Sequence, residues 1–411
     1  MARFGIGKRW REMVLLGCCL LLAVAGCRQE GKRQAPPAPT GPQALVWPKD
    51  QAYTGAYVDF GEAEDKVTLE AIEQFEKMVG KKQAIIAFSS FWGEQSFPRK
   101  NLELLARHGS LPLVYWSPWD RPYDERRPPD RFNLHAILAG KWDRYIDSWA
   151  DGAKAFGKPM LVSWGLEMNG DWFPWSGCYY GAGKVVPGTN PPRYEGPELF
   201  KKTFRYVVDR VRARGVTNIL WGFHVNHTTY PTAPWNKMAN YYPGPDYVDW
   251  LGMSVYGMQF NYQAWTKFID VTESAYHELA AVDPTKPMVL AEWGVGEFPG
   301  RGSKAEWIKE AFELLQGRYS RFRAAVFWHE RWQNEDKSYS NLRVNSSPEA
   351  LQAYRESVAA PYWLDRPMYK PRLSALAHAG NDMKGKRSEN GPEKTRSRKL
   401  GPLSRLLSLK H

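Results

Sequence analysis

The sequence predicts an α/β protein whose one large domain is a (β/α)8 barrel of the TIM type. Eight short apolar runs alternate with amphipathic stretches between residues 53 and 358, a pattern that is typical of a parallel sheet with crossover helices. Eight units are the number that closes such a sheet into a barrel. An open doubly wound sheet is the alternative, but the turn after the first run offers a single glycine, Gly61, where that fold has a glycine-rich phosphate loop.

The predicted strands are short and rich in Val, Ile, Leu and aromatic residues, as expected for strands that are covered on both faces. Glycine stop signals precede several of them, for example Gly80, Gly157 and Gly215. The eight strands are expected at 55–59, 84–88, 113–115, 160–164, 218–223, 250–255, 288–291 and 324–328.

The stretches between these strands carry apolar residues at helical spacing. Helices are expected at 68–79, 142–156, 197–214, 262–282, 303–315 and 348–358. The fifth unit is the exception, because 228–246 is rich in Pro, Tyr and Asn. We therefore expect little helix in that unit.

Composition and charge exclude several classes of protein. A chain of 411 residues with 43% hydrophobic and 14% aromatic residues is not mainly disordered, and it contains no internal apolar run long enough for a multi-pass membrane protein. The net charge of +12 lies at the two ends: residues 381–411 hold nine Lys and Arg against three Asp and Glu, and the first 34 residues are also basic. The body between them is nearly neutral, which argues against nucleic acid as a partner.

The N-terminus resembles a bacterial lipoprotein signal. A basic stretch to Arg11 precedes an apolar run at 13–25, and the four residues that end in Cys27 resemble the lipoprotein cleavage box. The resemblance implies cleavage before Cys27, its lipidation, and a place in the cell envelope, at the outer membrane or the cell surface. An ordinary signal peptide or a short membrane anchor is the alternative. The expected organisation is a signal peptide at 1–26, a tether at 27–49, a catalytic domain at 50–365 and a basic, disordered tail at 366–411.

Two predicted strands end in a carboxylate with aromatic neighbours. Glu167 follows the fourth strand, and Glu292 ends the seventh. Active sites of parallel barrels lie at the carboxyl ends of the strands, and two carboxylates that face one cavity are what glycoside hydrolysis needs. The sequence therefore predicts a glycosidase. Glu297 is a rival to Glu292, although it falls in a Gly/Pro loop. Cys178, the last cysteine of the exported domain, is expected to be packed and inert.

The segments around both carboxylates resemble glycoside hydrolase family 26, which contains many bacterial β-mannanases. Residues 167–177 (EMNGDWFPWSG) are similar to its acid/base segment, 242–256 to the approach and end of its sixth strand, and 291–294 (AEWG) to its nucleophile segment. The resemblance covers about 50–360. It implies a retaining double displacement on β-mannan or a related β-glycan, with Glu167 as acid/base and Glu292 as nucleophile. It also implies that Tyr256 donates a hydrogen bond to Glu292 and keeps it ionised, whereas Glu167 needs a raised pKa.

The chain departs from this family at two positions. The family usually has His directly before the acid/base and Arg three residues before that His, and here Leu166 and Ser163 stand at these places. His224, Asn226 or His135 are the candidates to compensate. A glycan-binding surface lipoprotein with weak or lost hydrolase activity is the alternative function, and an enzyme that trims a polysaccharide made by its own cell is a third.

Substrate contacts are expected from aromatic and amide side chains near the strand ends. These residues are Trp172, Trp293, Trp328, Asn226 and Asn169. No metal or cofactor is expected, because His224 and His227 lie at a strand end without the glutamate of a zinc protease helix. The expected partners are a polysaccharide and, through lipidated Cys27, a membrane, and we expect a monomer.

Overall fold

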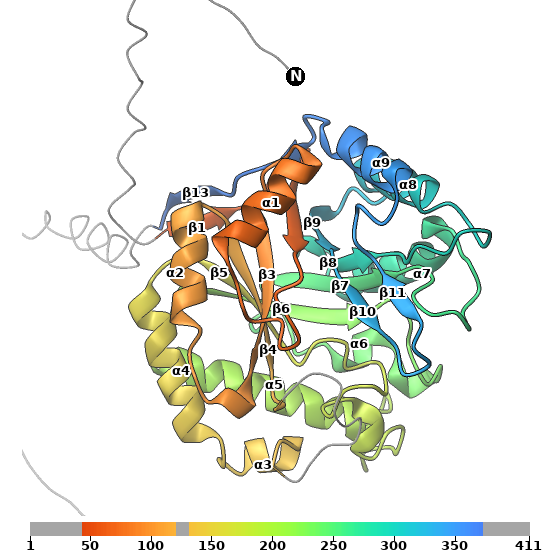
Figure 1. Cartoon of the computed structure of the whole chain (residues 1–411). Helices are drawn as coiled ribbons and strands as arrows, with labels where there is room; N and C mark the ends of the chain where they lie inside the picture. The colour runs from red at the N-terminus through yellow and green to blue at the C-terminus, as the bar shows by residue number, and fades with distance from the viewer. Residues whose placement is uncertain (1–42, 121–130, 373–411) are drawn as a thin grey trace, which may run out of the picture. The chain divides into compact units, whose positions relative to one another are not determined.

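The computed structural model describes residues 43–120 and 131–372, and in them eight parallel strands close into a barrel (Figure 1). Closure comes from β2 and β9, whose register runs from Tyr53 opposite Ala324 to Tyr57 opposite Trp328. The predicted (β/α)8 fold is confirmed. The barrel strands are β2 (Ala52–Tyr57), β3 (Ile85–Phe91), β4 (Leu111–Ser117), β5 (Met160–Trp164), β6 (Ile219–Asn226), β7 (Trp250–Tyr256), β8 (Met288–Gly294) and β9 (Phe322–Trp328).

Helices surround the barrel and cover the outer face of the sheet (Figure 1). Two of them, α2 and α3, were not predicted, because α3 has only five residues and α2 buries only Leu102 and Leu105. In the fifth unit α6 has four residues, in line with the prediction of little helix there. The helices are α1 (Leu69–Val79), α2 (Arg99–His108), α3 (Leu134–Leu138), α4 (Asp143–Phe156), α5 (Glu195–Ala213), α6 (Met238–Tyr241), α7 (Phe268–Val282), α8 (Lys304–Gln316) and α9 (Pro348–Val358).

Local signals fix where several helices begin and end. The Thr68 hydroxyl accepts the Ala71 N–H at the start of α1, and Gly80 ends that helix in the left-handed conformation with φ 73°. The helix predicted from 262 begins only at Phe268, because 262–267 form a loop. The last residue of that loop, Lys267, caps the helix, and its N–H donates to the Asp270 side chain in the first turn. That loop belongs to the carboxyl-end face of the barrel.

Two short strands lie inside ranges that were predicted to be unstructured. These strands, β1 (Gln43–Val46) and β13 (Met368–Pro371), pair antiparallel. A third short strand, β12 (Trp363–Leu364), lies within the predicted catalytic domain and extends the main sheet beside β2. The boundaries of the predicted tether and tail are therefore wrong at their inner ends. The reason is that four-residue strands paired across more than 300 residues carry no local periodicity. The rest of both segments and the signal with Cys27 lie outside the described residues, and the lipid anchor stays a prediction.

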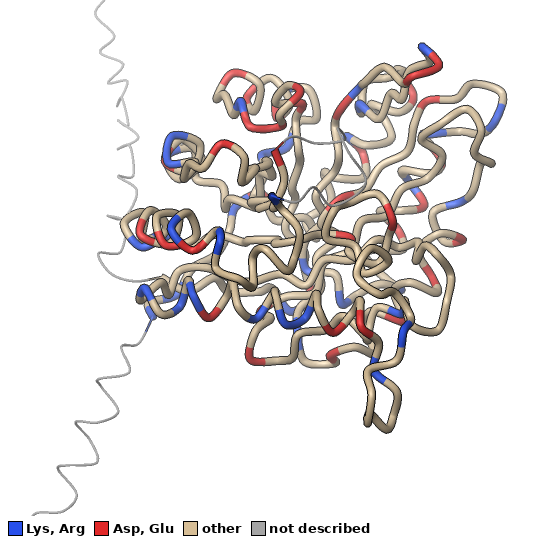
Figure 2. Tube along the Cα trace, turned by 90° about the horizontal axis from the view of Figure 1, so that it is seen from below, with Lys and Arg blue, Asp and Glu red and all other residues tan. Residues whose placement is uncertain are grey.

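The body of the molecule has a mixed surface charge. Basic and acidic residues are interspersed along the outer helices (Figure 2), in keeping with a nearly neutral domain. None of the helices in the described ranges combines the length and hydropathy that a membrane crossing requires.

Tyr53 ties the terminal strand pair to the barrel. Its hydroxyl donates to the Val46 carbonyl of β1 and accepts the Met368 N–H of β13. We expect Tyr53→Phe to lower the free energy of unfolding by about 1–3 kcal/mol, because it leaves two backbone groups without this partner. Urea unfolding of the full chain measures the loss, with Tyr369→Phe as the control because that side chain is 36% exposed on β13. Equal effects of the two variants would contradict the assignment.

Candidate active site

Glu167 lies in the turn that follows β5 and has a left-handed backbone with φ 54°. This conformation is uncommon for residues other than glycine. Two backbone hydrogen bonds hold it, because the Glu167 N–H donates to the His224 carbonyl at 2.7 Å and the Glu167 carbonyl accepts the Gly170 N–H at 3.0 Å. The side chain is buried, and its Oε2 accepts the indole N–H of Trp172 at 2.6 Å. A strained backbone thus fixes the carboxyl at the carboxyl end of the barrel.

Glu292 is buried on β8, and the end of β7 supplies its hydrogen-bond partner. The Tyr256 hydroxyl donates to Glu292 Oε2 at 2.8 Å, as the family resemblance implies. A register shift between Met253 and Ser254 in the β7–β8 pairing places Ser254 opposite Glu292. The two candidate carboxylates therefore come from β5 and β8, and both face the carboxyl end of the barrel.

The two carboxyls influence each other's ionisation. Burial raises the pKa of Glu167, and hydrogen bonds from Ser254, Asn226 and Trp172 oppose this rise. Burial, followed by the charge of Glu167, holds the pKa of Glu292 well above its ordinary value. The Tyr256 hydrogen bond opposes this rise in the pKa of Glu292, because it favours the ionised form, which is the direction that the family resemblance implies. The pair releases its protons in two separate steps, with a singly protonated state between them.

His224 occupies the barrel interior behind Glu167. Its Nδ1 lies 3.0 Å from the Ser163 hydroxyl, and its Nε2 lies 2.8 Å from the Ser254 hydroxyl. Burial lowers the pKa of His224 to about 3, so that the imidazole is neutral near pH 7. Because Ser254 in turn hydrogen-bonds Glu167, a chain of hydrogen bonds runs from Ser163 through the imidazole to the carboxyl. Ser163 is the residue that stands at the place of the family arginine.

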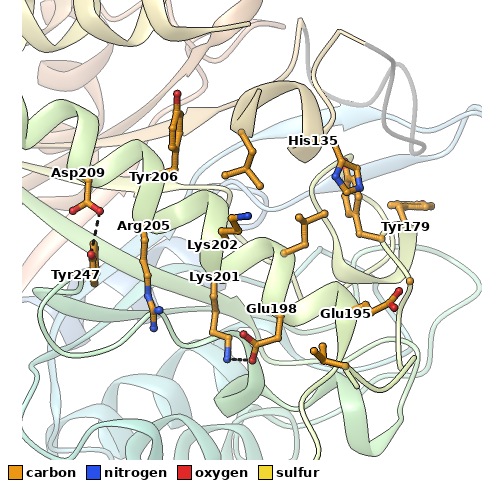
Figure 3. Close-up of a pocket in the computed structure, with 15 residues that line it drawn as sticks. His135, Tyr179, Glu195, Glu198, Lys201, Lys202, Arg205, Tyr206, Asp209 and Tyr247 are labelled. Atoms are coloured by element: carbon orange, nitrogen blue, oxygen red, sulfur yellow. Dashed lines mark hydrogen bonds and ion pairs between the residues drawn. The ribbon is translucent and has the colours of Figure 1, made fainter. Parts of the chain in front are cut away.

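The other two candidates for compensation differ in position. Asn226 ends β6 and hydrogen-bonds Glu167 directly. His135 belongs to α3 and lines a separate pocket of about 850 Å³ along the outer face of α5 (Figure 3). The predicted compensation from His135 is therefore wrong, because the chain folds it onto the outside of the barrel.

Asn169 is wrong as a predicted substrate contact. It has no exposed surface, its Nδ2 donates to the Asn226 carbonyl at 2.8 Å, and its Oδ1 accepts the Asn226 N–H at 2.9 Å. Its backbone carbonyl accepts from Asn236 and Tyr230. Asn169 thus joins the loop after β5 to the end of β6 and positions the Glu167 turn.

The three predicted tryptophans have different surroundings. Trp172 is half-buried and contacts Glu167. Trp328 stacks on Tyr57 with ring centroids 4.0 Å apart and donates its indole N–H to Glu330 at 2.7 Å. Trp293 is 1% exposed and packs among aromatic side chains of the helix layer, so that its prediction as a sugar contact is wrong. Adjacent residues of a strand point to opposite faces of the sheet. Because Glu292 points into the barrel, the next residue, Trp293, points outward.

Two further carboxyls near the pair were not predicted as site residues. Glu64 is buried in the loop after β2, where its Oε2 accepts the Ser89 hydroxyl at 2.5 Å, and Glu330 follows β9. Burial raises the pKa of Glu64 to about 7 and that of Glu330 to about 8. Their charges also raise the pKa of Glu292. Glu64 lies between acidic neighbours in a polar loop, so the sequence offers no signal for its burial.

The remaining candidates have structural surroundings. Glu297 accepts hydrogen bonds from the hydroxyls of Ser346 and Ser347 at the start of α9. These contacts give it a structural role and disfavour it as the nucleophile. Burial raises the pKa of the Cys178 thiol to about 11, which disfavours the reactive thiolate. Within the described ranges, no group of three or more His, Cys, Asp or Glu is arranged to hold a metal ion.

Comparison with known proteins identifies relatives of the chain. A model of glycosyl hydrolase family 26 matches residues 136–299, which include Glu167, Tyr256 and Glu292. Endoglucanase H of Acetivibrio thermocellus is 33% identical over 294 residues, which are 71% of this chain and 29% of that protein. Beta-1,3-xylanase TXYA of a Vibrio species is 21% identical over 56% of this chain and 49% of that protein. A mannan endo-1,4-beta-mannosidase of Bacillus subtilis is 31% identical over 39% of this chain and 36% of that protein. The chain thus spans less than half the length of these three relatives.

Solved structures share the fold. GH26C from Muricauda sp. MAR_2010_75 superposes with a TM-score of 0.57 at 17% identity, over 77% of this chain and 87% of that one. The Bacillus subtilis mannanase man26 superposes with a TM-score of 0.52 at 17% identity, over the same shares of the two chains.

The buried Glu64 carboxyl makes stability depend on pH. Its pKa is about 7 in the folded chain and about 4 in the unfolded chain. Between these values the unfolded state binds fewer protons, so the folded state loses stability as pH rises. We expect Glu64→Gln to raise the free energy of unfolding by roughly 3 kcal/mol more at pH 8 than at pH 5. Chemical denaturation at both pH values measures this, with exposed Glu62→Gln as the control. A gain that is independent of pH is the contrary result.

Proposed function

The chain belongs to glycosyl hydrolase family 26, and from this premise we propose that it is a retaining O-glycosyl hydrolase of β-linked polysaccharide. The observation that carries the proposal is the pair of buried carboxyls at the carboxyl end of the barrel. Glu167 and Glu292 are coupled through their charges, and each accepts a hydrogen bond from a different aromatic side chain, Trp172 and Tyr256. Retaining hydrolysis needs one protonated and one ionised carboxyl, and this pair passes through that state when it titrates.

The first step assigns opposite roles to the two carboxyls. Glu292 attacks the anomeric carbon with a carboxylate oxygen, and the bond from that carbon to the glycosidic oxygen breaks. Glu167 transfers its proton to the departing oxygen. The products of this step are a shortened glycan with a free hydroxyl, a glycosyl ester on Glu292 and an ionised Glu167.

The second step releases the sugar. Glu167 takes a proton from a water molecule, whose oxygen attacks the anomeric carbon, and the ester bond to Glu292 breaks. The surroundings of Glu167 suit a group that changes its charge in each step. Burial favours its protonated form, whereas the hydrogen bonds from Ser254, Asn226 and Trp172 favour its ionised form. The Tyr256 hydroxyl stabilises the carboxylate that leaves in this step.

The proposed substrate is a β-mannan or a related β-glycan, cleaved within the chain. Relatives of the chain are named for endoglucanase, β-1,3-xylanase and endo-β-mannosidase activities, and two of these names specify a β-linked backbone. Ser163 and Leu166 stand where the family pattern has Arg and His, and the Ser163–His224–Ser254 hydrogen bonds occupy this side of Glu167. Because of this difference, several polysaccharides have to be tested as substrates. It also supports a second candidate function, a glycan-binding protein that has lost turnover.

Substitution of either carboxyl tests the pair. We expect Glu167→Gln and Glu292→Gln each to lower kcat by at least about 100-fold on the polysaccharide that the unaltered protein cleaves best, because each removes a proton donor or a nucleophile. Released reducing ends from soluble mannan, mixed-linkage glucan and xylans measure the activity. Glu297→Gln is the matched control and keeps its activity. Unchanged turnover in both variants would falsify the assignment, and glycan binding without any release of reducing ends selects the second candidate.

The stereochemistry of the first product tests the mechanism. Two inversions at the anomeric carbon return it to the β configuration. Proton NMR of early hydrolysis is therefore expected to show the β-anomer before mutarotation adds the α-anomer. If the α-anomer comes first, then Glu292 acts as a base that activates water, and the double displacement is ruled out.

A further inference from the structure

Two loops at the carboxyl end of the barrel present aromatic rings that no step of the proposed hydrolysis uses. Phe260 and Tyr262 follow β7, and their rings stack with centroids 5.3 Å apart and an interplanar angle of 2°. Trp332 comes from β10 (Arg331–Gln333) and meets Phe260 edge-on at 6.4 Å. The Tyr262 side chain is 82% exposed. Because Phe260 covers one face of the Tyr262 ring, the exposure leaves the other face open.

We propose that Phe260, Tyr262 and Trp332, called the rim platform below, form a distal sugar-binding subsite for the polysaccharide chain. The proposal rests on the proposed function, because it supplies that function with a binding site beyond the carboxyl pair. Tyr262 offers the flat apolar face on which a neutral pyranose ring stacks. Phe260 supports it from below, and Trp332 supports Phe260.

The rim platform is built from the two loops that flank the strand of Glu292. β8 lies between β7 and β9 in the sheet. The Gly257 N–H donates to the Gly294 carbonyl at 3.0 Å, and the Gly296 N–H donates to the Met258 carbonyl at 2.8 Å. These bonds join the loop after β7 to the segment that follows Glu292. Phe260 lies four positions after Tyr256, so their Cα atoms are at most about 14 Å apart, and one polymer chain reaches both places.

The hairpin after β9 fixes the other side of the rim platform. β10 pairs with β11 (Tyr339–Asn341) and starts three residues after Trp328. The Ser340 hydroxyl donates to the Gln259 carbonyl at 2.6 Å, which joins this hairpin to the loop after β7. Figure 1 shows the hairpin beside the ends of β7 and β8.

Polar contacts hold the Phe260–Tyr262 loop in shape. The Gln263 side-chain oxygen accepts the N–H groups of Gln259 at 2.6 Å and of Phe260 at 3.1 Å. The Arg301 guanidinium donates to the carbonyls of Asn261 and Gln263. A loop that is ordered before binding loses little conformational entropy when a ligand arrives. This order explains how an aromatic side chain with little packing of its own stays in a fixed place.

A second exposed tyrosine on this face has a different environment. The guanidinium carbon of Arg331 lies 3.6 Å from the centroid of the Tyr339 ring, so a cation covers one face of that ring. Tyr262 is backed by an aromatic ring instead, and this difference assigns the sugar contact to Tyr262.

The test compares long and short substrates in the full-length protein. Tyr262→Ala removes the stacking ring, and Tyr262→Phe retains it. Tyr369→Ala is the control, because Tyr369 is an exposed tyrosine on β13, at the opposite end of the barrel strands. We expect Tyr262→Ala to raise KM for the polymer about three- to tenfold, with kcat and the hydrolysis of the shortest cleaved oligosaccharide within twofold of the unaltered protein. Tyr262→Phe and Tyr369→Ala are expected to match the unaltered protein.

Two kinetic results overturn the rim platform. One is an unchanged KM for the polymer in Tyr262→Ala, and the other is an equal loss on long and short substrates, which indicates a disturbed carboxyl pair. Retention in native gels that contain soluble mannan, mixed-linkage glucan or xylan separates this proposal from the proposed function. Weaker retention of Tyr262→Ala supports the platform even if none of these polymers is hydrolysed. Hydrolysis that depends on Glu167, with retention unchanged in Tyr262→Ala, overturns the platform alone.

Discussion

The pairing of β2 with β9 is the contact on which the rest of the structure depends. It closes the sheet, so that the carboxyl ends of all eight strands meet at one face. Closure also gives each strand residue a fixed side. Glu292 faces the barrel interior, and its neighbour Trp293 packs into the helix layer. An open sheet of the same strands would spread the loops after β5, β7 and β9 along an edge, and the carboxyl pair would not form.

Bringing acidic side chains together at this face opposes folding. Glu64, Glu167 and Glu292 are buried, and Glu330 lies near them. Each buried carboxyl accepts at least one side-chain hydrogen bond, from Ser89, Trp172 or Tyr256. These bonds reduce the cost of burial without removing it, since the pKa of each carboxyl stays raised. Functional sites commonly retain such unfavourable interactions, and the surrounding packing has to compensate for them.

The position of Glu167 depends on polar contacts between neighbouring strand ends. The reciprocal Asn169–Asn226 hydrogen bonds hold the turn after β5 against the end of β6, and the His224 carbonyl accepts the Glu167 N–H. The left-handed backbone of Glu167 persists because these contacts fix it from several directions. The family pattern of Arg and His is replaced here by the uncharged set Ser163, His224 and Ser254. The charge next to the acid/base candidate therefore differs from that pattern.

The sequence by itself determined the eight strands, the barrel class and the placement of Glu167 and Glu292 at strand ends. These features follow from local patterns, such as apolar runs between glycine stops. Such patterns predict strands and their ends without knowledge of distant contacts. Only the tertiary structure decided which neighbouring side chains face the site. Asn169 and Trp293 are close to the two carboxylates in the sequence. The Asn169 side chain nevertheless hydrogen-bonds the backbone of Asn226, and Trp293 points outward into the helix layer. Glu64 is far from both in the sequence but lies near Glu292. The β1–β13 pair depends likewise on contacts across more than 300 residues, because barrel closure and loop packing, rather than local periodicity, bring such groups together.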